Sequence, residues 1–202
     1  MHRMRWRQLV AMPLAALLLA GCGGGGQKPG PRTQVHRGIG MTAAEEAAQL
    51  VDKGARLLVF HYPIDVHESF QAQVDGLLSR ARKLDLKPTA VEVEVSQAPV
   101  PSISVEDFQR GLEKLPEPDA IITLGGSLPI DAADLLQGRE VAVVAFGANS
   151  RTEAGRARRG LCDAAIVPVD RYDHDGRIPG DPMKAFRLLY QVVRFDDEGN
   201  PR

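Results

Sequence analysis

Small polar residues follow the apolar segments of this sequence, at points where chemistry could take place. Gly125-Gly126-Ser127 comes directly after the apolar run Ala120–Leu124. These three residues would bring backbone N–H groups and a hydroxyl to the start of a helix, which suits an anion or a hydroxyl-rich solute. They suit equally a tight strand-to-helix turn with Ser127 near the helix cap. Both interpretations stay open.

A hydrolase is a third hypothesis for the same segment. Gly125-Gly126-Ser127-Leu128-Pro129 partly matches the nucleophile elbow of serine hydrolases, and Asp170 and His174 follow in the matching chain order. Pro129 stands where the second glycine of that elbow belongs. We therefore expect a protein that is not an enzyme, and keep a hydrolase that uses Ser127 as the lowest-ranked alternative.

Histidine and acidic residues gather in two places that could suggest a metal site. These residues are His61, Asp65, His67 and Glu68, and further on Asp170, Asp173, His174 and Asp175. Neither spacing matches a closed zinc site or a calcium-binding loop. We expect both groups to be solvated loops, with no metal and no cofactor.

Cys22 carries the most specific chemical signal. Arg3, Arg5 and Arg7 precede an apolar run from residue 9 to 20, which is shorter than the about 20 residues of a membrane-spanning helix. This is the pattern of a signal peptide. The run ends in Leu19-Ala20-Gly21-Cys22, which resembles the lipobox of bacterial lipoproteins. The resemblance implies cleavage before Cys22, lipid on its thiol, and a place in the cell envelope. Gly23 instead of Asp favours the outer membrane over the inner membrane.

Composition limits the remaining choices. The chain has 202 residues and a net charge of −1, and it becomes more acidic once the three leader arginines are removed. An acidic chain argues against nucleic acid as a partner, because phosphate binding needs a basic patch. Of the two cysteines, Cys22 is used by the lipid, so no internal disulfide can form. We expect Cys162, at the start of an apolar stretch, to be a small buried hydrophobe.

The remaining sequence alternates helix and strand signals. We expect a signal peptide over 1–21, a lipidated flexible tether over 22–40, an α/β domain over 41–195 and a frayed polar tail over 196–202. The predicted strands are 56–60, 90–95, 120–124, 141–146 and 162–167. The predicted helices are 42–54 with a capping box at Thr42, 68–84, 104–115, 131–136, 151–158 and 182–193. Buried apolar strands separated by helices predict a single Rossmann-like (flavodoxin-like) three-layer α/β domain with a mainly parallel five-stranded sheet.

The order and spacing of these segments resemble the second lobe of type I periplasmic binding proteins, the ribose-binding and lac-repressor-like superfamily. Pro118–Ile122 is similar to the family's P-D-A-I entry into a strand. Val143–Gly147 is similar to its V-V-G-F-D strand, and Gly160–Ile166 to its G-x-I-D-A-T-V strand. The resemblance covers most of residues 41 to 193. It implies a non-enzymatic lobe that binds a small polar solute, such as a carbohydrate, in an ABC-type uptake or sensing system.

Departures from the family pattern shape the alternatives. Relatives close two lobes around the solute, whereas one lobe is expected here, so a homodimer or a transporter or receptor partner would complete the cleft. The family's sugar-contacting Asp is Gly147, its Asn-Asp pair is Gly125-Gly126-Ser127, and its helix arginine aligns with Gln73. These replacements motivate the second hypothesis, a degenerate binding fold that serves as a protein-interaction module on the envelope.

The candidate ligand-binding residues share one predicted location. In an open parallel sheet, ligands lie beyond the C-terminal strand ends at the switch point of the topology. Asn149 is also expected to cap the helix that follows it. The set comprises His61, Tyr62, Gln73, Gly125, Gly126, Ser127, Gly147, Asn149, Asp170 and Tyr172.

Overall fold

The structure, a computed structural model, describes residues 30–94, 102–169, 178–196 and 198–202. Six strands in this part of the chain form one sheet in the order β2-β1-β3-β4-β5-β6. The strands are β1 Arg56–His61, β2 Lys87–Glu92, β3 Ala120–Thr123, β4 Ala142–Phe146, β5 Ala164–Pro168 and β6 Tyr190–Arg194. The first five are parallel, and β6 pairs antiparallel with β5.

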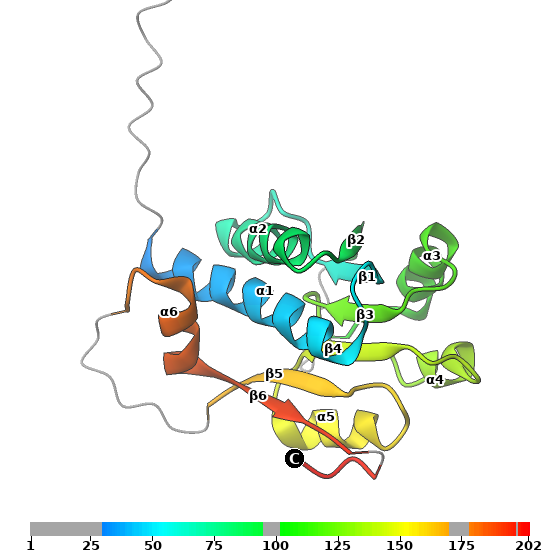
Figure 1. The fold of residues 1–202 in the computed structure, drawn as a ribbon. Helices are drawn as coiled ribbons and strands as arrows, with labels where there is room; N and C mark the ends of the chain where they lie inside the picture. Colours follow the sequence, from blue (N-terminus) through cyan, green and yellow to red (C-terminus); the bar gives the residue numbers. More distant parts are fainter. Residues whose placement is uncertain (1–29, 95–101, 170–177, 197) are drawn as a thin grey trace, which may run out of the picture.

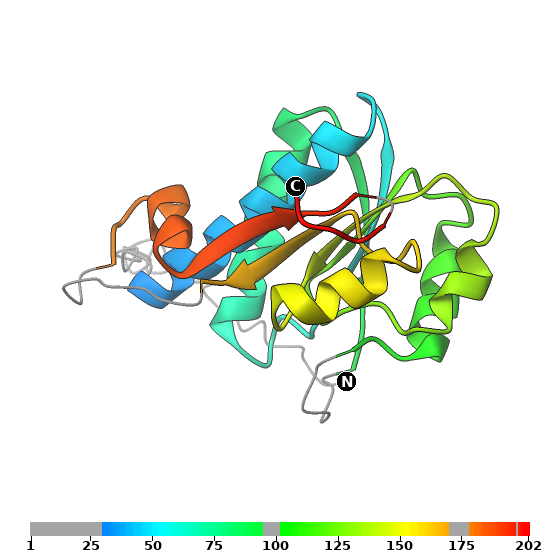
Figure 2. The same cartoon turned by 90° about the horizontal axis from the view of Figure 1, so that it is seen from below.

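Helices cover both faces of the sheet, as Figures 1 and 2 show. The helices α1, α2 and α6 pack on one face, while α3, α4 and α5 pack on the other. Their bounds are α1 Pro31–Leu50, α2 Glu68–Lys83, α3 Val105–Lys114, α4 Ala132–Leu136, α5 Ser150–Ala157 and α6 Pro182–Leu189. The predicted three-layer α/β fold with a mainly parallel, flavodoxin-like sheet is therefore confirmed. The predicted number of five strands is wrong, because β6 adds a sixth strand along β5.

Continuous apolar strands explain why the sheet is buried on both sides. In β1, Leu57 and Val59 face the cluster under α1 and α2, whereas Leu58 and Phe60 face the cluster under α3 and α4. Cys162 is buried, as predicted, beside Ala145 and Ala165. Burial and the nearby negative charge of Glu153 raise the pKa of the Cys162 thiol well above its ordinary value, so the thiol stays protonated.

The first helix begins about ten residues before the position predicted from the sequence. Residues 31–40, expected to belong to a flexible tether, form the first half of α1, with Pro31 in its first turn. The predicted capping box at Thr42 is wrong, because Thr42 is buried in the middle of the helix. The helix also ends at Leu50, before the predicted stop at Gly54. Gly54, which has φ +82°, lies in the turn between α1 and β1 and does not end the helix.

The glycines of this segment are packing residues. A Cβ on Gly40 would collide with the backbone of Gln73 in α2, and a Cβ on Gly76 would collide with the carbonyl of Arg37. On the other side of α1, Gly38 lies against the carbonyl of Pro182 in α6. Glycine in a Pro-rich context predicted a linker, whereas here it permits two helices to pack directly on the backbone of α1.

The end of the chain also differs from its prediction. The helix predicted over 182–193 stops at Leu189, and Tyr190–Arg194 forms β6 along β5. Tyr190, Val192 and Val193 are β-branched or aromatic, and they favour a strand once the edge of β5 is available. The tail is not frayed, because the Arg202 N–H donates to the Arg194 carbonyl at 2.8 Å.

An ion pair fastens β6 to α1. Arg194 donates to both carboxylate oxygens of Glu46, at 2.8 Å and 3.0 Å, and also to Gln49 at 2.9 Å. The carboxylate of Glu46 is buried, whereas the side chain of Arg194 is 47% exposed, so this bidentate pair lies at the surface and is partly reached by water. Within the described residues, no helix has the length and apolar character needed to cross a membrane.

We expect Gly40→Ala to lower the free energy of unfolding by roughly 1–3 kcal/mol, because the new methyl group must push α1 away from α2. Gly155→Ala is the matched control. Gly155 lies in α5, and its Cβ would meet no atom within 4 Å. That change should raise the free energy of unfolding by about 0.5–1 kcal/mol. Urea unfolding followed by circular dichroism measures both, and equal stability of the two variants would contradict the packing role of Gly40.

Candidate functional site

A small hollow lies at the C-terminal edge of the sheet, where the order of the strands reverses between β1 and β3. Its volume is about 200 Å³. It is lined by residues at or just beyond the ends of four strands: Tyr62, Leu124, Gly126, Phe146, Gly147, Ala148 and Pro168. The hollow therefore brings together three of the candidate residues, Tyr62, Gly126 and Gly147.

The walls of the hollow are aromatic. The ring of Tyr62 lies against Phe70 of α2, with the ring centroids 5.1 Å apart. On the opposite wall, Phe146 packs against Tyr190 at 5.6 Å, and Tyr190 in turn stacks on Phe186 of α6 at 6.1 Å. These contacts hold both walls in place from helices on the same face of the sheet.

The turn after β3 needs its glycines. Gly126 has φ +102°, which side-chain-bearing residues rarely adopt, and a Cβ on Gly125 would lie 2.8 Å from the Val93 side chain. Ser127 does not cap a helix, because the N-cap of α4 is Asp131. The tight-turn interpretation thus describes the backbone, but the predicted capping position of Ser127 is wrong.

Ser127 points into the protein, where it meets a buried carboxylate. Its hydroxyl donates to Glu153 Oε1 at 2.7 Å, and the side chain of Glu153 is fully buried. Arg156 lies 3.4 Å from the same oxygen and donates through Nε to the Leu128 carbonyl at 3.0 Å. This Ser127–Glu153–Arg156 network joins the loop after β3 to α5.

Glu153 occupies the space that a side chain at position 147 would take. A Cβ on Gly147 would collide with Cγ of Glu153 and lie 2.8 Å from its Oε1. Gly147 is therefore required by the buried carboxylate beneath it. The second oxygen, Oε2, is buried and has no hydrogen-bond partner among the described residues. Burial raises the pKa of Glu153, while Ser127 and Arg156 act in the opposite direction.

Two other candidate side chains, His61 and Gln73, form contacts inside the protein. His61 is buried, and its Nδ1 lies 2.8 Å from the carbonyl oxygen of Tyr62. Gln73 is buried between α1 and α2, with its amide nitrogen 3.0 Å from Nδ1 of His36. Burial, with a smaller contribution from His67, lowers the pKa of His36. His61 and Gln73 therefore bond inside the protein and do not line the hollow.

The remaining predicted residues divide in two. Asn149 caps α5 as expected, since its side-chain oxygen accepts the Thr152 N–H at 2.8 Å. Asp170 and Tyr172 lie outside the described residues, as do Cys22 and His174. For the hydrolase hypothesis, Ser127 is 1% exposed and donates to Glu153, which is not the arrangement of an accessible nucleophile. Among the described residues, no group of three His, Cys, Asp or Glu side chains could hold a metal ion.

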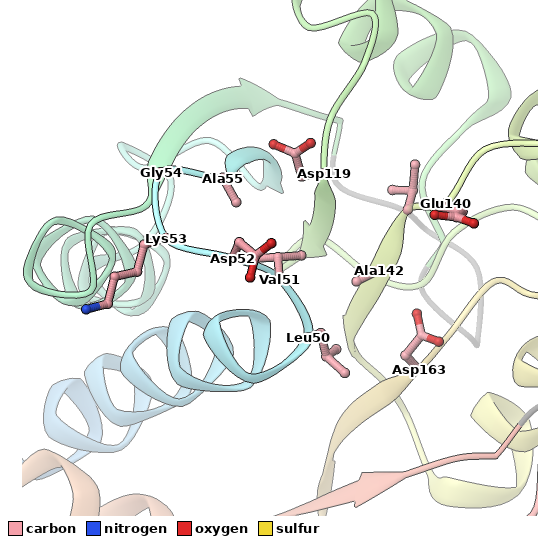
Figure 3. A pocket seen from close by; sticks show the side chains of 11 residues that line it. Leu50, Val51, Asp52, Lys53, Gly54, Ala55, Asp119, Glu140, Ala142 and Asp163 are labelled. Carbon is pink, nitrogen blue, oxygen red and sulfur yellow. The ribbon is translucent and has the colours of Figure 1, made fainter.

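A larger hollow, about 660 Å³, opens at the opposite edge of the sheet. Figure 3 shows the carboxylates of Asp52, Asp119, Glu140 and Asp163 around it. Two of them bind the backbone at the start of strands: Asp119 accepts the Arg56 N–H at 2.7 Å, and Asp163 accepts the Val143 N–H at 2.7 Å. These acidic residues order the strand starts, so we place the candidate site at the C-terminal edge.

Comparison with known proteins supports the fold. No family model and no curated protein sequence matches the chain. Among solved structures, it is similar to AraP, an arabinose-binding protein from Geobacillus stearothermophilus, with TM-score 0.51 and 17% identity over 65% of this chain and 45% of that chain. GanP, a glucose-galactose binding protein from the same organism, gives TM-score 0.53 and 16% identity over 79% and 60%. The XylFII–LytSN complex gives a TM-score of 0.54 and 13% identity, over 79% of this chain and 59% of that chain.

These similarities show a shared fold. The described residues have the α/β architecture of one lobe of a periplasmic sugar-binding protein, and the chain spans about half the length of those structures. Sequence reasoning missed Phe146, Glu153 and Arg156. Phe146 ends an apolar strand and could have been chosen from that position. Glu153 and Arg156 lie on a short polar helix, where nothing in the sequence marks them as buried.

We expect the buried carboxylate to make stability depend on pH. Because the native state raises the pKa of Glu153, the unfolded state loses the proton first as the pH rises above the ordinary value of 4.5. In that range the native state binds more protons, so this residue makes stability fall with rising pH. In Glu153→Gln, the decrease in the free energy of unfolding that Glu153 causes should disappear. Unfolding of both proteins between pH 4.5 and pH 8 measures the difference, and parallel pH profiles would refute the assignment.

Proposed function

We propose that this chain is a lipid-anchored, extracytoplasmic protein that binds a small polar solute, with carbohydrates the first class to test. The observation that carries the proposal is the aromatic-walled hollow at the C-terminal edge of the sheet, lined by Tyr62, Gly126 and Gly147. In open α/β sheets this edge, at the switch point, is where ligands bind. The proposed role is non-enzymatic, and the alternative of a hydrolase is disfavoured because its nucleophile, Ser127, is buried and donates to Glu153.

The chemistry of the hollow suits a ring with one apolar face. The rings of Tyr62 and Phe146 offer surfaces against which the C–H face of a sugar can pack. The backbone at Gly126, Gly147 and Ala148 has no bulky side chain over it, so its polar groups can approach hydroxyls closely. Structures of this fold include an arabinose-binding and a glucose-galactose binding protein, which supports this class of solute.

A second surface should complete the site. The hollow, about 200 Å³, is smaller than the roughly 300–1,000 Å³ of typical ligand pockets. A second copy of the chain, or a transporter or receptor domain, would close over the solute and bury the rest of it. The XylFII–LytSN complex shows that a protein of this fold can be found with a partner. Such pairing would fit an uptake or sensing system.

The anchor places the protein in the envelope. The basic start, the short apolar run and Cys22 support lipidation of that cysteine, and Gly23 favours the outer membrane. Extracytoplasmic placement also agrees with one solved protein of this fold, from Actinobacillus succinogenes, which is described as an ABC transporter periplasmic solute binding protein.

A protein-interaction module is the second candidate, and specific observations favour it. Gln73 and Ser127, which replace polar positions of the family, are bonded inside the protein to His36 and Glu153. Ile64, Val66 and Ile130, in the loops after β1 and β3, are exposed apolar residues at the same edge. An apolar edge with its polar groups turned inward suits contact with another protein.

Thermal unfolding against a panel of sugars, amino acids, nucleosides and organic anions tests the solute hypothesis. We expect one class to raise stability by about 2.7 kcal/mol at a hundred times Kd, because the ligand binds the native state alone. The protein should begin at Gly23, so that α1 is retained. Tyr62→Ala should weaken that binding about tenfold through loss of ring stacking. Glu140→Gln, in the hollow at the opposite edge, is the matched control and should bind normally.

Two results would change the assignment. No response to any solute class would favour the interaction module. Equal loss of binding in Tyr62→Ala and Glu140→Gln would move the site away from the hollow. Light scattering on the same samples, with and without solute, measures the oligomeric state of the protein. A monomer under all conditions would count against the homodimer.

Replacement of Cys22 tests the anchor directly. We expect the protein expressed in a bacterium to partition into a detergent phase with the mass of its acyl chains attached at residue 22. Cys22→Ala should remove both the added mass and the partitioning. Cys162→Ala is the matched control, because that buried thiol has no part in lipidation. Detergent partitioning that survives in Cys22→Ala would overturn the lipoprotein assignment.

A further inference from the structure

The sheet ends in two edge strands, β2 and β6, and each of them pairs with one neighbour (Figure 1). An edge strand presents backbone N–H and C=O groups to which another strand can bind. At β6 the chain uses part of its own edge, because Arg202 donates to the Arg194 carbonyl and Tyr190 donates to Phe186. Within the described residues, no backbone segment pairs with the outer edge of β2.

The bonds between β2 and β1 decide which backbone groups of β2 face outward. The Lys87 N–H donates to the Ala55 carbonyl, and the Val93 N–H donates to the His61 carbonyl. The odd-numbered residues of β2 therefore direct their backbone groups toward β1. The even-numbered residues at 88, 90 and 92 direct theirs away from the sheet.

The outward groups of β2 alternate in kind along the strand. Pro88 has a carbonyl but no N–H, because its ring removes the donor. Ala90 has both groups, and neither has a partner among the described residues. Glu92 offers its N–H alone, since its carbonyl already accepts a bond from the Arg110 side chain at 2.8 Å. From start to end, the edge thus presents an acceptor, a donor with an acceptor, and a donor.

This pattern is complementary to itself when two such strands run antiparallel. With Ala90 opposite Ala90 of a second copy, these two residues exchange a pair of bonds, and each Glu92 N–H donates to the Pro88 carbonyl of the other copy. Where Pro88 lacks its N–H, it faces the Glu92 carbonyl, which keeps its bond from Arg110. Moving the register by two residues in either direction would leave the Ala90 carbonyls or the Ala90 N–H groups without a free partner. The backbone therefore favours one register.

Opposite charges at the two ends of β2 favour the same arrangement. At its start, exposed cations outnumber exposed carboxylates: Lys53, Arg82, Lys83 and Lys87 against Asp52 and Asp85. Arg56 and Arg80, at the same end, are paired with Asp119 and Glu45. At its end and in the neighbouring β1–α2 connection, carboxylates are in excess: Asp65, Glu68, Glu92 and Glu94 against Arg110, which pairs with Asp107. Antiparallel pairing brings the basic start of one copy beside the acidic end of the other.

We propose that two copies of this chain associate through their β2 strands, which pair antiparallel about Ala90 and join the two sheets into one. The strands of the two copies then run in opposite directions, so the two hollows point away from each other. Pairing through β2 leaves each hollow open, and a different protein would supply the surface that completes it. The proposal depends neither on the lipid anchor nor on the identity of the solute.

Cross-linking at residue 90 tests the interface and its register. A protein that begins at Gly23 keeps every described residue and has the buried Cys162 as its one native thiol. In Ala90→Cys, the new thiols lie at the axis, where the Cα atoms of a hydrogen-bonded pair are about 5.5 Å apart. In Glu94→Cys, the matched control, they lie about 27 Å apart along the strands. We expect a short bis-methanethiosulfonate to join Ala90→Cys into a covalent dimer roughly tenfold faster than Glu94→Cys.

Two further variants test the hydrogen bonds and the charges. Light scattering should show a dimer for the unaltered protein and a monomer for Ala90→Pro, which removes the central N–H at an outward position where an edge strand tolerates proline. Circular dichroism checks that this variant keeps its fold. Arg82→Glu/Lys83→Glu should raise the dissociation constant of the dimer about tenfold, because like charges then meet across the interface. Arg151→Glu/Arg159→Glu, exposed cations at the two ends of α5, should leave it unchanged.

Each contrary result overturns the proposal. A protein that stays monomeric at every concentration lacks the interface. A dimer in which Ala90→Cys cross-links no faster than Glu94→Cys uses another surface or register. Full dimerisation of folded Ala90→Pro would show that the Ala90 bonds are not made. If Ala90→Pro is unfolded, the cross-linking rates and Arg82→Glu/Lys83→Glu decide. Solute binding is measured separately by thermal unfolding, so its failure and the failure of this interface are distinguishable.

Discussion

Direct backbone contact between α1 and its two neighbouring helices is the constraint on which the other features of the fold depend. Gly38 and Gly40 on α1, and Gly76 on α2, leave no room for a Cβ, so the three helices can meet in one arrangement only. That arrangement places α6 against α1 and brings Tyr190 beside Phe146. It also aligns β6 with β5 and gives Glu46 its partner Arg194. The wall of the hollow and the sixth strand therefore both follow from how closely α1 can pack.

The sequence predicted the central sheet well because its strands depend on local composition. Apolar runs such as Val143–Ala145 can only be buried, and helices between them force a parallel sheet. The strand predicted over 90–95 is β2 at Lys87–Glu92. The larger errors lie at α1 and at β6, where tertiary contacts decide the structure. Gly38 and Gly40 have the composition of a linker, and their value appears only once α2 and α6 lie against them. Tyr190 to Val193 continue an amphipathic helix in sequence, but the free edge of β5 offers them more hydrogen bonds.

The candidate site was predictable in position and less so in detail. Topology alone places Tyr62, Gly126 and Gly147 at one edge, because the C-terminal ends of parallel strands meet there. The direction of each side chain could not be predicted in the same way. Ser127 points inward because its hydroxyl donates to the buried Glu153, and Gln73 points toward α1 because its amide contacts His36. Both partners are distant in the sequence. Glu153 also belongs to α5, a short helix of polar composition.

Glu153 explains why the residue after β4 carries no side chain. A side chain at position 147 would occupy the space that Glu153 fills, so Gly147 and the buried carboxylate go together. Burying this group has a desolvation cost, and the bonds from Ser127 and Arg156 offset it in part. In return, the loop after β3, which carries Gly126, is tied to α5. Among the described residues, no charged side chain lines the hollow. Under the proposed function, polar recognition therefore relies on backbone groups and on the surface that closes over them.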